Sequence, residues 1–432
     1  MCRYCLLVLS LSVSSSIAQV QVPVSTEEVI VQQVEESYDH AVALLEESVN
    51  INSGTLNLAG VKAVGELFAG EFEDLGFATE WIDGAPFNRA GHLVASHGDK
   101  GPKILLIGHL DTVFAADSPL QQYERTGEHF ARGPGTTDMK GGNVVMLQAL
   151  RALRDAGALD ALSIRAVLTG DEESQGHPVP LRTAALLEAA EWANYAIGFE
   201  DGDGNPSTAV ISRRGTTGWI LTVSGKPGHS SQVFQPEFGY GAIYEVARIL
   251  NAFREALSAE PNLTFNPGLI AGGTEVERAE GGNRASSYGK TNIIAGSVYA
   301  KGDLRTISTA QREAAKQRMR EIVAENLPVT HAEIEFIDGY PPMAPSDGNR
   351  ALLEIFDQAS RDLGLGSVAA VNPRNAGAAD ISYAADHVEM AMDGVGLMGS
   401  GGHTVDEMAD LRTLNQQSKR VAVLLYRLSQ LR

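Results

Sequence analysis

Short apolar segments alternate with amphipathic helical segments along most of this 432-residue chain. Helical spacing of apolar residues predicts helices over 26–48, 56–75, 143–156, 181–192 and 411–431. The expected strands are 77–82, 92–96, 103–108, 162–169, 194–199 and 209–212. Strands that alternate with helices are typical of a mostly parallel sheet with helices on both faces. We therefore predict an α/β fold built on a mostly parallel central sheet.

This alternation changes near Arg213. The expected elements that follow are a strand at 217–224, a helix at 238–257, extended segments at 262–271 and 291–304, a helix at 309–326 and a strand at 331–337. Strand, helix, two strands, helix and strand form the split βαβ pattern of a small ferredoxin-like sandwich. The first alternation then resumes. We predict one main domain over 26–213 and 341–432, interrupted by an inserted domain over 214–340.

Composition excludes several classes of partner. The chain carries 54 Asp+Glu against 34 Lys+Arg, a formal net charge of −20. Such a charge repels phosphate backbones and no basic stripe offsets it, so we expect no nucleic-acid partner. Beyond the N-terminus, no apolar run approaches the roughly 20 residues of a transmembrane helix, so we expect no membrane partner.

Residues 1–18 have the layout of a secretory signal peptide. Arg3 precedes an apolar stretch at 5–13 that is too short to cross a bilayer, and small residues suited to cleavage follow. The alternative is a buried N-terminal helix or strand, but the polar segment QVQVPVSTEE comes next. We therefore expect an exported chain, secreted or periplasmic. Cleavage would remove both cysteines, Cys2 and Cys5, so any transition-metal site must use His, Asp and Glu.

Candidate metal ligands begin at the end of the strand expected at 103–108. His109 and Asp111 are two residues apart, so in an extended chain they point the same way and can touch. A metal-bound imidazole usually donates its other N–H to a carboxylate, a role that suits Asp111. Open α/β sheets bind their ligands at the carboxyl ends of strands. Alone, this pair of residues is a weak pattern.

Four further stretches place acids or histidine at strand ends or in glycine-rich turns. Asp138 lies in GPGTTDMKGG before a helix, where glycines allow close backbone approach to a buried ion. Glu172 and Glu173 end TGDEE, in which three successive acids repel one another unless a cation or proton intervenes. A solvated acidic loop is the alternative there. Glu200 ends an apolar strand in GFED, and His403 lies in GGHT.

Two imidazoles and three carboxylates together suit two zinc ions, with cobalt or manganese as alternatives. In their order and approximate spacing, GHLDTVF, GPGTTDMKGG, TGDEES, GFED and GGHT resemble the aminoacylase/glutamate carboxypeptidase family of dizinc exopeptidases, which includes carboxypeptidase G-like metallopeptidases. The resemblance covers essentially the whole chain after the signal peptide. It implies a zinc-exopeptidase catalytic domain and an inserted lid domain. The zinc ligands that it implies are His109 and Glu200 for one ion, Glu173 and His403 for the other, and Asp138 as the bridge.

The resemblance also implies roles in the chemistry. Asp111 would orient His109, and Glu172 would be the general base that takes a proton from the metal-bridging water and returns it to the leaving amine. His229, in GKPGHSS, would reach the active site of a partner subunit and stabilise the oxyanion. A homodimer through the lid domain follows from that role. The family also has a cis peptide bond after the residue that matches Asp138, so we predict one between Asp138 and Met139.

Other positions concern the substrate. By resemblance, Asn292 and Arg305 would hold its carboxylate, and Gly377 would lie in its pocket. Glutamate-releasing members carry an arginine near the end of the lid, where this chain reads GYPPM at 339–343. The glycine-rich segment that normally contains Thr-Asp reads NAGAAD at 375–380. These departures argue against a glutamate preference and leave the metal centre untouched.

The expected function is a secreted dizinc metallohydrolase that releases a C-terminal amino acid from a small peptide or an N-acyl amino acid. The alternatives are an aminoacylase or deacylase with the same metal centre, and a metal- or substrate-binding protein that has lost catalysis. Glu172, Asp111 and His229 argue against lost catalysis, because binding needs neither a base nor an oxyanion donor. A serine hydrolase that uses Ser230 or Ser231 is disfavoured, since no G-x-S-x-G turn is present.

Overall fold

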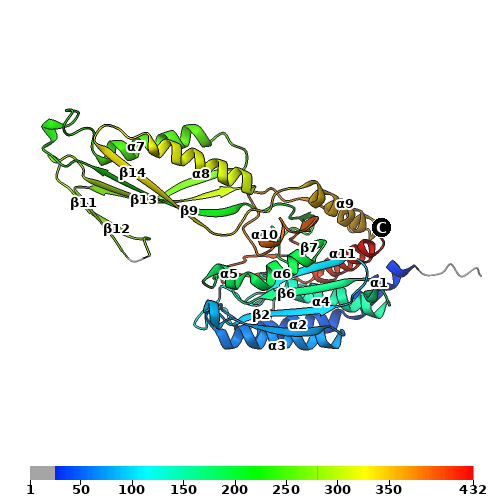
Figure 1. Cartoon of the computed structure of the whole chain (residues 1–432). Coiled ribbons are helices and arrows are strands. Elements are labelled where there is room, and N and C mark those ends of the chain that lie inside the picture. Colours follow the sequence, from blue (N-terminus) through cyan, green and yellow to red (C-terminus); the bar gives the residue numbers. More distant parts are fainter. Residues whose placement is uncertain (1–24, 280, 432) are drawn as a thin grey trace, which may run out of the picture.

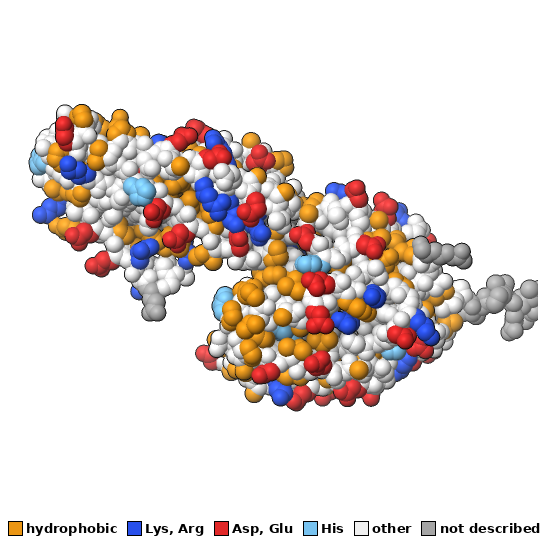
Figure 2. Space-filling view, in the orientation of Figure 1, with side chains coloured by type: hydrophobic (Ala, Val, Ile, Leu, Met, Phe, Trp, Pro, Cys, Tyr) orange, Lys and Arg blue, Asp and Glu red, His pale blue; other side chains and the backbone are white. Residues whose placement is uncertain are grey.

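The computed structural model describes residues 25–279 and 281–431, which form a larger lobe and an elongated smaller lobe (Figure 1). The expected signal peptide at 1–18 lies outside these residues. Within them, no helix is both long enough and apolar enough to cross a bilayer. On the face shown in Figure 2, acidic and basic side chains are interspersed over both lobes.

A six-stranded sheet crosses the larger lobe in the order β1-β2-β6-β3-β7-β16. Its strands are β1 Ala78–Asp83, β2 Gly91–His97, β3 Lys103–His109, β6 Ser163–Thr169, β7 Tyr195–Gly198 and β16 Met390–Met392. Strands β6, β3, β7 and β16 pair in parallel, whereas β1 and β2 extend the sheet as antiparallel strands. Strand β3 is buried on both faces beyond Lys103, which accounts for its continuous apolar sequence. The predicted α/β class and mostly parallel sheet are confirmed.

Helices cover both faces of this sheet. They are α1 Thr26–Glu36, α2 Tyr38–Val49, α3 Leu58–Asp74, α4 Lys140–Asp155, α5 Val179–Arg182, α6 Ala184–Trp192, α9 Asp347–Asp362, α10 Ile381–Ala384 and α11 Arg412–Ser429. Side chains from α1, α2, α3, α4, α9 and α11 share one core with the sheet, and α6 and α10 share another. Helix α4 is buried on nearly every side because α1, α2, α11 and β3 all pack against it.

Local sequence signals start several of these helices. Ser25 and Glu28 form a capping box at α1, in which each side chain bonds the other residue's backbone N–H. Asn57 accepts a hydrogen bond from the backbone N–H of Gly60 at the start of α3. Each cap satisfies a backbone donor that the helix itself leaves unpaired.

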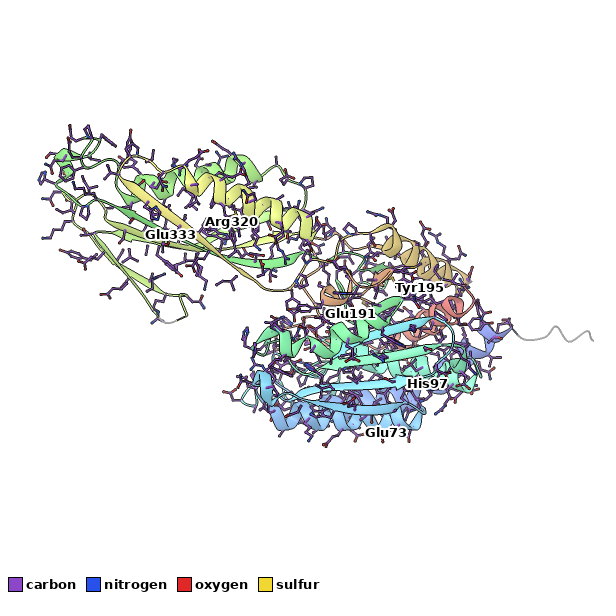
Figure 3. All side chains as sticks on the ribbon, in the orientation of Figure 1. Glu73, His97, Glu191, Tyr195, Arg320 and Glu333 are labelled. Carbon is purple, nitrogen blue, oxygen red and sulfur yellow. The ribbon has the colours of Figure 1, made fainter. Side chains whose placement is uncertain are left out.

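The smaller lobe, which we call the lid, is a four-stranded antiparallel sheet covered on one face by two helices (Figure 1). Its elements are β9 Gly215–Gly225, α7 Ala242–Leu257, β10 Thr264–Gly273, β13 Ser297–Thr306, α8 Thr309–Ala324 and β14 Thr330–Asp338, with sheet order β10-β13-β9-β14. Trp219 and Phe253 are fully buried in its core, where their rings pack edge to face. Figure 3 shows Arg320 on α8 and Glu333 on β14.

Smaller sheets complete the structure. Strands β4 Glu124–Arg125, β5 Phe130–Arg132, β17 Gly399–Ser400 and β18 Met408–Asp410 form one sheet, and β8 Thr208–Ala209 pairs with β15 Ala369–Ala370. A hairpin of β11 Glu275–Arg278 and β12 Ala285–Tyr288 extends the lid. Single 3-10 turns lie at Ala85–Phe87, Leu159–Ala161 and Ser230–Gln232.

Several predicted element boundaries were wrong. The helix expected over 26–48 is two helices, because the backbone leaves helical geometry at Ser37. The helix expected over 238–257 begins at Ala242, since Gly239 and Gly241 adopt positive φ and form a turn. The hairpin of β11 and β12 was missed because its glycine-rich, charged sequence lacks apolar alternation.

Candidate metal centre

Three neighbouring parallel strands end together at one edge of the central sheet. His109 is the last residue of β3, the acidic segment 171–173 follows β6, and Glu200 follows β7. Because β6, β3 and β7 are adjacent, their carboxyl ends bring these side chains to one place. Asp138 approaches from the turn before α4, and His403 from the connection between β17 and β18.

Two groups of potential metal ligands form there and share one carboxylate. The first is His109, Asp138 and Glu200, and the second is Asp138, Glu173 and His403; within each group the ligand atoms lie within 4.8 Å of one another. Asp138 Oδ1 is 3.0 Å from His109 Nε2, and Asp138 Oδ2 is 2.9 Å from His403 Nε2. The two oxygens of Asp138 therefore face two different imidazoles, as a bridging ligand requires.

Each group also contains a glutamate close to its imidazole. Glu200 Oε1 lies 3.6 Å from His109 Nε2, and Glu173 Oε2 lies 3.1 Å from His403 Nε2. The peptide bond between Asp138 and Met139 is cis, which confirms that prediction.

Negative charge is concentrated at this site. Burial and neighbouring carboxylates raise the pKa of Glu172 and of Glu200 well above its usual value. Burial alone would lower the pKa of His109, but the surrounding carboxylates, Glu200 foremost, raise it well above the usual value. Hydrogen bonds with Asp138 and Glu173 raise the pKa of His403 to about 11. Positive charge is therefore strongly favoured between these carboxylates.

The donor set fits two divalent cations. Imidazole and carboxylate are ligands that zinc, cobalt and manganese accept. Glu173 Oε1 is buried without a hydrogen-bond partner among the described residues, as expected of an atom whose partner is a cation. In the first group, His109 Nε2 faces the carboxylates while Nδ1 lies 3.0 Å from the backbone oxygen of Asp111, which fixes the orientation of the ring.

Asp111 does more than contact His109. Its Oδ1 lies 3.4 Å from His109 Nδ1 and accepts a hydrogen bond from the backbone N–H of Glu172. Its Oδ2 accepts hydrogen bonds from the N–H of Glu173 and from Thr55 Oγ1. One buried carboxylate therefore links the imidazole at the end of β3 to the acidic segment after β6.

Glu172 is adjacent to the metal centre but belongs to neither ligand group. Its backbone N–H is held by Asp111 and its backbone oxygen by Tyr340 Oη at 3.0 Å. Both backbone contacts hold this residue in place while leaving its carboxylate outside the two groups.

The lid residues make contacts within the lid. His229 Nδ1 is 2.8 Å from Ser231 Oγ, and the backbone oxygen of Asn292 accepts a hydrogen bond from Ser230 N–H. Arg305 Nε donates to Asp303 Oδ2 at 2.8 Å. No contact among the described residues brings His229, Asn292 or Arg305 to the metal centre. Gly377, in the larger lobe, accepts a hydrogen bond from Arg213 Nη1 through its backbone oxygen.

Sequence reasoning missed several residues that support the ligands. Fully buried Glu407 accepts hydrogen bonds from the backbone N–H groups of Gly135, Thr137 and Asp138. Burial raises the pKa of Glu407 to about 7, although these backbone bonds favour its charged form. Glu407 is one of three acids in the segment HTVDEMAD, and nothing in that segment signals this role, because its partners lie about 270 positions earlier.

A buried ion-pair network underlies the acidic segment. Arg182 Nε donates to Asp171 Oδ1 at 3.0 Å, and Arg182 Nη2 donates to Asp380 Oδ1 at 2.6 Å. The guanidinium also lies beside the rings of Tyr340 and Tyr383, 5.7 and 5.4 Å from their centroids. The first of the three successive acids is therefore ion-paired with an arginine, and the second and third lie at the metal centre.

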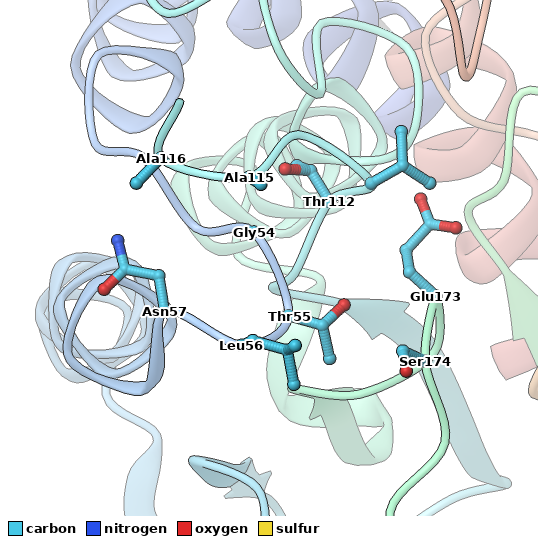
Figure 4. A pocket seen from close by; sticks show the side chains of 10 residues that line it. Gly54, Thr55, Leu56, Asn57, Thr112, Ala115, Ala116, Glu173 and Ser174 are labelled. Atoms are coloured by element: carbon cyan, nitrogen blue, oxygen red, sulfur yellow. The ribbon is translucent and has the colours of Figure 1, made fainter. Parts of the chain in front are cut away.

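A pocket of about 580 Å³ opens beside Glu173. Glu173 and Ser174 lie on one side of it, and Ala115 and Ala116 on the other (Figure 4). The connection between α2 and α3, with Leu56, completes its wall. The metal centre and this pocket therefore share a side chain.

Comparisons with known proteins agree with this arrangement. A sequence model described as Peptidase family M20/M25/M40 matches residues 105–427. Carboxypeptidase G2 of Pseudomonas sp. (strain RS-16) is 26% identical over 382 residues, which cover 87% of this chain and 86% of the relative. The aminopeptidase PepT of Bacillus cereus superposes with a TM-score of 0.69 at 20% identity, covering 90% of this chain and 98% of that one.

A second solved structure, the YXEP protein of Bacillus subtilis, is described as a dinuclear metal-binding peptidase of the M20 family. It superposes with a TM-score of 0.64 at 14% identity and covers 92% of this chain and 99% of that one. Both structures share the fold over most of their length, lid included.

Proposed function

Since this chain belongs to peptidase family M20/M25/M40, we propose that it is an exported dizinc hydrolase that releases a C-terminal amino acid from a small peptide or an N-acyl amino acid. The observation that carries the proposal is the pair of ligand groups that share Asp138, next to Glu172, whose carboxylate belongs to neither group. The similarity to carboxypeptidase G2 supports release from the C-terminal side.

In this proposal, His109 and Glu200 would hold one zinc, Glu173 and His403 would hold the other, and Asp138 would be a ligand of both. Two zinc ions at this place would supply Lewis-acid activation of a water molecule and of the scissile carbonyl. A carboxylate oxygen of Glu172 accepts the proton of the attacking water and then donates it to the leaving nitrogen.

The lid would bind the far end of the substrate. Arg305 can grip a carboxylate with two N–H groups once it exchanges Asp303 for the substrate, and Asn292 can donate a further hydrogen bond. We propose that His229 acts on the metal centre of a partner subunit in a homodimer. Its exposed position in the lid, away from the chain's own ligands, supports this role.

The test of the proposed base is Glu172→Gln, which retains size but cannot accept the proton. We expect kcat for N-acyl amino acids and dipeptides to fall by roughly 10²- to 10⁴-fold while the chain still binds two zinc ions, as measured by elemental analysis. The matched control is Glu188→Gln, on the exposed side of α6, which should leave both quantities unchanged. An unchanged kcat in Glu172→Gln would exclude this residue as the base.

A further inference from the structure

A cavity of about 310 Å³, which we call the lid pocket, lies in the lid and not at the metal centre. It is enclosed between the hairpin of β11 and β12 and the face of the lid sheet that α7 and α8 leave uncovered (Figure 1). Leu221 and Val223 of β9 are buried in the core beneath the helices, so Thr222 between them points to the uncovered face. None of the residues that line the lid pocket belongs to the two metal-ligand groups.

Two rows of cross-strand neighbours form the floor of the lid pocket. In the strand order β13, β9 and β14, the first row is Ser297, Ser224 and His331, and the second is Tyr299, Thr222 and Glu333. Side chains directly opposite each other on neighbouring strands lie about 5 Å apart. The floor is therefore a compact polar surface, with hydroxyl groups in its middle and an acid and a histidine along β14.

The hairpin covers this floor and supplies a cation. Val276 and Arg278 of β11 line the lid pocket, whereas Glu277 between them points away, because side chains alternate along a strand. Tyr299 Oη donates a hydrogen bond to the backbone oxygen of Gly282 at 2.9 Å, which ties the turn of the hairpin to the sheet. The guanidinium of Arg278 lies 5.3 Å from the centre of the Tyr299 ring, a contact that holds the cation over β13.

Opposite charges therefore face the lid pocket from opposite sides. Arg278 lies over β13 and forms no ion pair within the part of the chain that the structure describes. Glu333 lies on β14, where its Oε1 is 3.2 Å from His331 Nε2 and its Oε2 is left for another donor. A simple anion would meet the carboxylate of Glu333, and a simple cation would meet Arg278. A molecule that carries both charges suits the pocket best.

Hydroxyl groups between the two charges can bond the middle of such a molecule. Thr222 Oγ1 and Ser297 Oγ have no hydrogen-bond partner among the described residues, and Ser224 Oγ makes a long contact of 3.5 Å with the backbone oxygen of His331. Each hydroxyl can therefore donate to a ligand and accept from it. The volume of about 310 Å³ is that of about ten water molecules, which suits a ligand of amino-acid or dipeptide size.

We propose that the lid pocket binds a small zwitterion, a free amino acid or a dipeptide, with its carboxylate on Arg278 and its ammonium group on Glu333. The hydroxyl groups of Thr222 and Ser297 bond the polar part between the two charges. Substrates and products of the proposed function belong to this class of molecule, but binding in the lid pocket requires neither the metal ions nor Glu172.

Calorimetry measures the binding of L-alanine and of L-alanyl-L-alanine to the zinc-loaded Glu172→Gln chain. In this background, Arg278→Gln and Glu333→Gln should each weaken binding in the lid pocket by roughly 10- to 100-fold, since each removes a bond between opposite charges. The matched controls are Arg284→Gln on the same hairpin and Glu335→Gln on the same strand, because both residues are exposed and neither lines the pocket. All four substitutions leave the metal centre unchanged, so any ligand bound there contributes equally to each measurement.

Two blocked compounds test the need for both charges. L-alaninamide lacks the carboxylate and N-acetyl-L-alanine lacks the ammonium group, so each should lose at least tenfold in affinity for the lid pocket relative to L-alanine. Tighter binding of L-alanine would identify an amino acid as the ligand, and tighter binding of L-alanyl-L-alanine would identify a peptide; either result supports the site.

Three results would each overturn the inference. They are equal binding in Arg278→Gln and Arg284→Gln, equal binding in Glu333→Gln and Glu335→Gln, and blocked compounds that bind the lid pocket as tightly as L-alanine. The binding of L-alanine involves no hydrolysis, so this test remains decisive even if the chain proves not to be the proposed hydrolase.

Discussion

Glu407 shows how one side chain can hold a metal-ligand loop. Its carboxylate accepts three backbone N–H groups of the turn that presents Asp138. In Glu407→Gln, one carboxylate oxygen becomes an NH₂ group that faces backbone donors and cannot accept from them. We expect a loss of about 2 kcal/mol of stability, or a fall in Tm of roughly 4–8 °C.

Thermal unfolding in the presence of a chelator measures this effect without a contribution from metal. The control is Asp406→Asn, the exposed neighbour in the same loop, which should unfold at the wild-type temperature. A Glu407→Gln variant as stable as this control would mean that these backbone hydrogen bonds do not depend on a carboxylate at this position.

At the residue scale, the sequence predicted the residues that gather at the metal centre better than those that support them. His109 ends β3, and Glu173 and Glu200 come shortly after β6 and β7; residue type at or just after a strand end is a local signal. Glu407 and Asp380 have no such signal, because each acts through a partner that only the folded chain brings near. The assignment of each ligand to an ion remains a prediction.

At the scale of elements, Asp338 joins a helix and two strands of the lid. It ends β14, accepts a hydrogen bond from Lys316 of α8 at 2.7 Å and another from Thr217 of β9 at 2.9 Å. Partial burial would raise the pKa of Asp338, but these hydrogen bonds outweigh it and lower the pKa. Stability from this group is therefore present above pH 4 and is lost as pH falls through the lowered pKa.

We expect Asp338→Asn to destabilise the lid at pH 7 by about 1 kcal/mol, a value reduced for the partial exposure of the carboxylate. The difference from wild type should shrink below pH 4, where Asp338 itself becomes protonated. Hydrogen exchange of the β14 amides measures this difference in lid stability, with Glu333→Gln on the same strand as the control. A difference that is constant between pH 7 and pH 3.5 would rule out the ionic contribution.

Element boundaries were predicted most closely where the apolar pattern is strong, as for β3 and for the end of α4. They failed where backbone geometry decides, as at Ser37 between α1 and α2 and at Gly241 before α7. Each failure lies at a residue whose conformation depends on a turn, and apolar spacing carries no information about turns.

At the scale of the whole molecule, the lid joins the larger lobe through two paired segments, one entering β9 and one leaving β14 (Figure 1). Arg213, on the first segment, pairs with Asp393, whose Oδ1 accepts the backbone N–H of Glu200. Tyr340, on the second, donates from Oη to the backbone oxygen of Glu172 at 3.0 Å. The first connection therefore helps to hold Glu200 of the metal centre, and the second helps to hold Glu172, the proposed base.

We expect Tyr340→Phe to lower kcat by roughly 10- to 100-fold with little change in KM, bound zinc or Tm. Phenylalanine retains the ring beside Arg182 but removes the hydroxyl that positions Glu172. Tyr383→Phe is the matched control, because its ring also lies beside Arg182 while its hydroxyl bonds only Gln175 among the described residues. Equal kcat values in the two variants would show that Tyr340 serves packing alone, and that Glu172 is positioned without help from the connection to the lid.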